Sequence, residues 1–343
     1  MNRKVLLAIA AVLTAGAATA ARAAEKQVTP AEAILTCVPA DAIIAVRVRM
    51  TQLAASDVWK RLTADPKCPY RKFVRDWPLA IDPEKDIADA IFIVAADVGG
   101  GERKEPRAGA VLYLTRDTNI DNLFRSRPRE VNMPVAARVF RAPGDLLVAW
   151  QGPRWIHIGN REYITRALGG GPPPCDATGE AFWRTTLDAP GEVIMAYRQT
   201  EAVRQMAEKT RIEAVERLLK PPVTREKARE FIGFDFGSRL GLDILTATLR
   251  LDLSREADAL EVAGSFASDE AAACVGANLA YAEPSVRAAV TAAAQPAKGP
   301  PPAAAQQAAP LYSVKYQGRE GRLTATRAAI DRLVSLAAPA PRK

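Results

Sequence analysis

The sequence predicts an α+β protein made of two related units, each with a mostly antiparallel sheet and helices packed on one face. Short runs of alternating apolar residues recur along the chain, as expected of half-buried strands. Apolar stripes at helical spacing separate several of these runs. A run of glycines and prolines at 169–174 divides the 343-residue chain, and the order strand, helix, strand pair recurs after it.

The first 23 residues have the composition of a secretory signal peptide. Arg3 and Lys4 precede an uncharged apolar run at 5–20, and the small residues at 18–20 and 21–23 suit cleavage. We therefore expect an exported protein, periplasmic or extracellular; a signal segment retained as an anchor is the alternative. No later segment is long and apolar enough to predict a transmembrane helix.

The first unit is expected to span residues 24–168 and to open with a strand in the stretch 38–50, after a turn at 39–41. Alternation along this strand puts Arg47 and Arg49 on a face that we expect to be exposed. A helix follows and ends at Asp65 and Pro66. The other elements are predicted as strands at 90–96, 108–115, 135–141, 146–151 and 155–159, with helices near 119–124 and at 162–168.

The second unit is expected to span residues 175–343, after the 169–174 linker. Its predicted elements are strands at 192–198, 245–253 and 260–266, a hairpin at 311–326, and helices at 201–220, from 269 onward and at 327–336. Pro284 is expected to break or restart the helix that begins at 269. Residues 296–310 contain little except proline, alanine and glutamine, a composition that cannot build a core. We expect them to form a disordered loop.

Four cysteines, Cys37, Cys68, Cys175 and Cys274, lie beyond the signal segment. In an exported protein they allow disulfides with three connectivities. Cys37 precedes the first strand and Cys68 follows the next helix, and an antiparallel strand and helix bring those two ends together. The spacing therefore favours a Cys37–Cys68 disulfide, with four reduced thiols as the alternative.

The amino-acid composition limits the classes of binding partner that we expect. The formal net charge of +8 is modest for this length and indicates solubility more than a specific polyanion site. Aromatic residues make up only 6% of the chain, which argues against stacking platforms for nucleic acid. We expect no nucleic-acid partner; an envelope protein or polymer fits better.

His157 is the only histidine in the sequence, so any catalytic site that needs a histidine must use it. Neither a G-x-S-x-G nor an S-x-x-K motif accompanies it, and we interpret His157 as a residue on the outer face of its strand. The acidic residues at 82–89 resemble a calcium loop, but Ile87 and Ile93 replace its glycine and glutamate. No cofactor or metal site is predicted.

The chain resembles uncharacterised exported proteins of planctomycete-type bacteria, which carry a domain of unknown function. The resemblance lies in the phrase VPADA at 38–42, SDVWK at 56–60, DPEKDI at 82–87, the strand pair at 145–159 and the hairpin and helix at 246–273. It implies an α+β fold but no activity and no site residues. The Pro/Ala-rich segment at 296–310 departs from the pattern.

These observations favour a non-catalytic interaction or scaffold protein of the cell envelope. Two alternatives remain open at this point. One is a periplasmic protein that binds a small ligand between its two halves, and the other is a hydrolase that uses His157. No catalytic residue is assigned.

Overall fold

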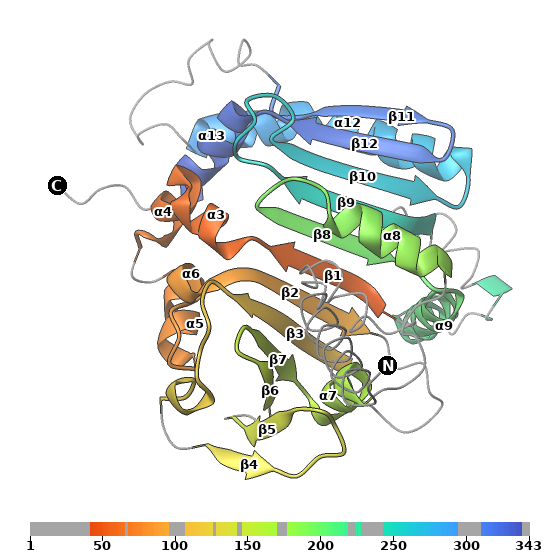
Figure 1. The fold of residues 1–343 in the computed structure, drawn as a ribbon. Coiled ribbons are helices and arrows are strands. Elements are labelled where there is room, and N and C mark those ends of the chain that lie inside the picture. Colours follow the sequence, from red (N-terminus) through yellow and green to blue (C-terminus); the bar gives the residue numbers. More distant parts are fainter. Residues whose placement is uncertain are drawn as a thin grey trace, which may run out of the picture.

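The computed structural model describes residues 42–65, 68–77, 79–95, 107–125, 128–142, 146–169, 177–218, 224, 226–227, 243–293 and 310–337 (Figure 1). The first part of the chain contains β1 (Ala42–Val48), α3 (Met50–Ala55), α4 (Asp57–Thr63), α5 (Pro69–Asp76), α6 (Pro83–Asp86), β2 (Ile87–Ala95), β3 (Arg107–Leu114), the 3-10 helix η1 (Ile120–Asn122), β4 (Arg129–Val131), β5 (Arg138–Arg141), β6 (Leu147–Gly152), β7 (Trp155–Gly159) and α7 (Arg161–Leu168). The second part contains α8 (Ala177–Leu187), β8 (Val193–Arg198), α9 (Glu201–Leu218), β9 (Ile244–Leu251), β10 (Leu260–Phe266), α12 (Asp269–Ala293), β11 (Ser313–Gln317), β12 (Glu320–Ala325) and α13 (Arg327–Ala337).

The described strands form one 12-stranded sheet, in the order β11-β12-β10-β9-β8-β1-β2-β3-β7-β6-β5-β4. Every neighbouring pair is antiparallel. Strand β1 joins the two parts, because it pairs with β2 on one side and with β8 on the other. The two sequence units therefore share one continuous sheet.

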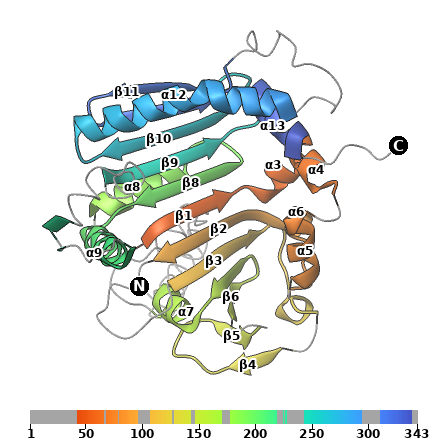
Figure 2. The ribbon, with the colours of Figure 1, turned by 180° about the vertical axis from the view of Figure 1, so that it is seen from behind.

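Helices cover both faces of this sheet. Ala45 pairs with Ile93 and with Ala196, so all three side chains project to the same face, where they pack with Trp183 of α8. We call this the α8 face; α7 also packs there. The opposite face carries α12 in the second part of the chain, as the views from the two sides show (Figures 1 and 2).

The core therefore has several compartments. On the α8 face, a cluster around Trp183 includes buried residues from β1, β2, β3, β5, β6 and β8. On the other face, a second cluster packs under α3 and η1, with Leu79, Leu112 and Ile156 fully buried. A smaller cluster joins α3 and α4 to α13, through residues such as Leu53 and Val334.

The predicted α+β class with a mostly antiparallel sheet is confirmed. The position of the helices differs from the expectation of one covered face, since α8 and α12 lie on opposite faces. The predicted break at Pro284 is wrong: α12 continues through it to Ala293. Helix α8 was not predicted, although it covers the junction of β1 and β8.

Several predictions fall outside the described residues. These are the signal peptide at 1–23, Cys37 and Cys175, most of the 169–174 linker, and the Pro/Ala-rich segment at 296–310 apart from its last residue. Among the helices that the structure describes, none has the length and apolar character needed to cross a membrane.

Candidate functional site

An apolar hollow lies between α12 and strands β9 to β12, and its volume is about 270 Å³. On the sheet side, one row of paired residues explains it. Ala247 of β9 pairs with Gly264 of β10, Gly264 pairs with Gly321 of β12, and Gly321 pairs with Tyr316 of β11. Three adjacent positions of this row thus carry a methyl group or no side chain, and α12 passes above them. We call this hollow the α12 cavity.

The side chains that α12 contributes to the cavity are also apolar, and most of them are small. Ala272, Val275, Gly276 and Leu279 recur at helical spacing and line it. Gly276 allows α12 to lie close to the Tyr316 ring of β11, because a Cβ atom at residue 276 would lie only 2.3 Å from Cδ1 of that ring. The start of the helix is fixed by Ser268, whose Oγ accepts a hydrogen bond from the backbone of Ala271 at 3.1 Å.

Phe266 provides an aromatic wall. A Cβ atom at Gly321 would lie 3.1 Å from Cε2 of the Phe266 ring, and one at Gly264 would lie 3.6 Å from the same atom. The ring therefore extends toward both glycines and also packs with Ala271 and Ala272 at the start of α12. Larger side chains at the two glycine positions would compete with this ring for space.

Arg322 borders the α12 cavity, but its charge lies on the opposite face of the sheet. Its register partner is Ala263, whose neighbours Val262 and Gly264 point under α12. The Arg322 guanidinium forms an ion pair with Glu261 on the α8 face. Glu261 also accepts a hydrogen bond from Arg250 at 2.6 Å. These ion pairs lie on the α8 face, away from the cavity.

A larger hollow of about 580 Å³ lies beside β5 and η1, and it is more polar. Arg138 and Glu130 form two hydrogen bonds of 3.0 and 2.9 Å in it, and Arg138 lies over the Phe140 ring. Arg125 donates to the backbone carbonyls of Val74 and Arg75. Its arginines are thus engaged by groups of the protein itself, which makes it the weaker candidate.

Arg47 and Arg49 are structural residues, and the expectation that they lie on an exposed face is wrong for Arg47, which is 8% exposed. Arg47 contacts both carboxylate oxygens of Asp89, at 3.0 and 3.4 Å, and donates to the carbonyl of Leu187 at 2.7 Å. Arg49 donates to the carbonyls of Ala189 and Gly191. Arg47 therefore meets the C-terminal end of α8, where helix carbonyls lack intrahelical partners, and Arg49 binds the segment that follows the helix.

His157 lies in the core, so its predicted place on an outer face is wrong. It is 1% exposed and pairs with Val111 and Ala149, which belong to the cluster on the α8 face. Its Nε2 atom lies 2.9 Å from Oε1 of Gln151. Burial lowers the pKa of His157 to about 4. The neutral ring is thus part of the packing, and a substrate has no direct route to it.

This burial predicts a pH dependence of stability. The unfolded chain binds a proton at His157 near pH 6.5, but the folded chain binds it only near pH 4. Stability is therefore complete above about pH 6.5 and decreases as the pH falls toward 4, by about 3 kcal/mol in total from this residue. Urea unfolding of the wild type and of His157→Leu between these pH values measures the effect. The variant should show a shallower decrease, and equal slopes would contradict the assignment.

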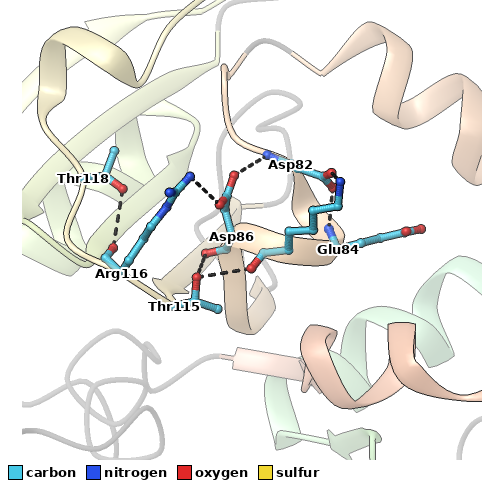
Figure 3. Close-up of polar contacts among 7 residues, drawn as sticks. Asp82, Glu84, Asp86, Thr115, Arg116 and Thr118 are labelled. Carbon is cyan, nitrogen blue, oxygen red and sulfur yellow. Dashed lines mark hydrogen bonds and ion pairs between the residues drawn. The ribbon is translucent and has the colours of Figure 1, made fainter.

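Residues 82–86 of the acidic stretch at 82–89 form the polar turn before β2 (Figure 3), and Asp89 lies within β2. Asp82 accepts a hydrogen bond from the backbone of Glu84 at 3.0 Å, and Asp86 pairs with Arg116 at 3.0 Å. The carboxylate of Asp89 is engaged by Arg47. No group of acidic, histidine or cysteine side chains within the described ranges could hold a metal ion.

The Cys37–Cys68 disulfide stays a prediction, because Cys37 lies outside the described residues. Cys68 is a free thiol at the start of α5, and Cys274 is a free, exposed thiol on α12. Sequence reasoning did not find the α12 cavity. The available signal was the set Gly264, Gly276 and Gly321, since glycines inside strands and helices often mark a close approach or missing volume.

The chain matches no protein-family model and no curated protein. Solved structures that align with this chain include crystal form III of TP0453, a Treponema protein. That alignment covers 89% of this chain and 97% of the other, at 9% sequence identity and a TM-score of 0.44. Crystal form I of the same protein aligns over 91% of this chain and 99% of the other, at 10% identity and a TM-score of 0.40.

Proposed function

We propose that this chain is an exported, non-catalytic protein that binds a small molecule in the α12 cavity. The observation that carries the proposal is the apolar hollow of about 270 Å³ between α12 and the sheet. Close-packed protein interiors contain few voids larger than a water molecule. Ligand sites, in contrast, are typically concave, lined by apolar and aromatic side chains, and few in number.

The volume of the α12 cavity is large enough to hold a small organic molecule. A cavity of about 150 Å³ accommodates benzene, so one of this size has room for about ten carbon atoms. A bound molecule would restore the missing contacts between α12 and the strands.

The other functions considered from the sequence have less support. A hydrolase that uses His157 conflicts with the 1% exposure of that residue. The site proposed here also differs from a cleft between the two halves, because β1 and β8 join the halves in one sheet and the α12 cavity lies within the second part of the chain. A scaffold role for a partner in the envelope stays a prediction. Export rests on the composition of residues 1–23.

Filling the cavity should abolish binding. Ala247 lines it from β9, and Ala247→Leu would place an additional isopropyl group beside Gly264. We expect a loss of affinity of about tenfold or more for apolar ligands, since the ligand and the new side chain occupy the same space. The measurement is ligand-induced thermal stabilisation across a panel that contains apolar and charged molecules of about six to twelve carbons.

Thr248→Leu is the matched control, because residue 248 is the next position on β9 and points to the α8 face. It adds a similar side chain outside the cavity and should leave binding unchanged. Ala272→Leu fills the cavity from α12 and serves if Ala247→Leu does not fold. The proposal is wrong if no panel member stabilises the wild type, or if both filling variants bind as the wild type does.

A further inference from the structure

We infer that the α12 cavity selects an uncharged, hydrocarbon-like ligand and rejects the same molecule when it carries a charged group. The inference rests on the proposed function and specifies the ligand class. It depends on three features of the site: the side chains that line it, the state of its backbone groups, and the direction of the one charged residue at its border.

Apart from Arg322, the side chains that line the cavity from the described part of the chain offer no hydrogen-bonding group to a ligand. From the strands, the cavity receives Ala247, Val262, Phe266, Val314 and Leu323, together with the bare backbone of two glycines. From α12 it receives only alanine, valine, glycine and leucine. A polar ligand atom placed here would lose its water without gaining a side-chain partner, which is unfavourable.

The backbone amide and carbonyl groups of β10 and β12, which lie under the cavity, are also unavailable to a ligand. Strand β10 lies between β9 and β12 and pairs with both, so Gly264 faces Ala247 on one side and Gly321 on the other. Strand β12 is likewise paired on both sides, with β10 and β11. The amide and carbonyl groups of these two strands therefore serve the sheet, as buried backbone groups must. They cannot serve a ligand without breaking the ladder.

The one charged residue at the border does not change this conclusion. Arg322 contributes to the wall, but its guanidinium pairs with Glu261 on the opposite face of the sheet. A ligand carboxylate in the cavity would be separated from that cation by the sheet itself. It would also have to compete with Glu261, which already binds both Arg322 and Arg250.

Phe266 gives the cavity a preference for flat or compact hydrocarbon groups. Its ring reaches toward Gly264 and Gly321, and a ligand lying on the glycine row would meet it. Aromatic pairs in offset or edge-to-face contact are favourable beyond the area that they bury. Naphthalene, with about as many carbons as the volume admits, is therefore a suitable probe.

The test compares naphthalene with 1-naphthoate, which has the same ring and an added carboxylate, at neutral pH. Dissociation constants from thermal stabilisation or calorimetry should favour naphthalene by about 100-fold or more, because the carboxylate would be buried without a partner. Naphthalene binding should be lost in Ala247→Leu and kept in Thr248→Leu. Uncharged 1-naphthol should fall between the two ligands.

The outcomes separate this inference from the proposed function. Equal or tighter binding of 1-naphthoate, abolished by Ala247→Leu, would overturn the inference and leave the cavity as a ligand site. Binding of naphthalene that both Ala247→Leu and Ala272→Leu leave unchanged would overturn both. Preferential binding of naphthalene that the filling variants abolish and Thr248→Leu retains would support both.

Discussion

Replacing Arg47 by alanine is expected to lower the free energy of unfolding by about 3–5 kcal/mol. Arg47 is 8% exposed, contacts both oxygens of Asp89 and donates to the Leu187 carbonyl. Its removal leaves the largely buried carboxylate of Asp89, 14% exposed, and the C-terminal end of α8 without their main cation. Removing one partner of a buried ion pair lowers the free energy of unfolding by more than the intact pair contributed, because the remaining charge stays desolvated. Urea denaturation at neutral pH measures the loss.

Arg138→Ala is the matched control for Arg47→Ala. Arg138 also forms a two-pronged contact with a carboxylate, that of Glu130, but both side chains are about half exposed. Water replaces such a contact readily, so the control should show little change in stability. Equal losses for the two variants would contradict the structural role of Arg47. The double variant Arg47→Ala/Asp89→Ala should be less destabilised than the sum of the single variants.

Arg47 also shows why the sequence predicts the strands well but does not predict which helices pack on their faces. The alternation along β1 was visible, and β10 was predicted to the residue, at 260–266. Alternation identifies two faces but does not say whether the second face meets water. The covering element for Arg47 is the end of α8, which lies 140 residues later in the chain. That contact is tertiary, and no local pattern encodes it.

The join between the two units and the candidate site were missed for a similar reason. The pairing of β1 with β8 depends on strand order, which short-range periodicity does not specify. The α12 cavity arises where glycines of three separate elements meet, at positions 264, 276 and 321. Each glycine alone suggests only flexibility or a close approach. Their combined effect appears only when the register across β9, β10, β12 and β11 is known.

The second large effect concerns Trp183, the side chain by which α8 is anchored to the sheet. Trp183 is fully buried, and its neighbour Phe182 is partly buried with the ring centroids 5.2 Å apart. Trp183→Ala should lower the free energy of unfolding by about 3–5 kcal/mol, because the helix cannot fill a void of that size. Phe182→Ala is the control on the same turn and should cost clearly less.

Trp183 and Arg47 should act as one unit, since both hold α8 over the junction of β1 and β8. Trp183 packs the body of the helix, and Arg47 binds the carbonyl of its last residue, Leu187. When Trp183→Ala has loosened the helix, the Leu187 carbonyl is no longer held in place for Arg47. The loss of unfolding free energy in the double variant should therefore be smaller than the sum of the losses in the two single variants. Strict additivity would mean that the packing of α8 and the binding of its C-terminal end are independent, and that β1 and β8 are held together by their ladder alone.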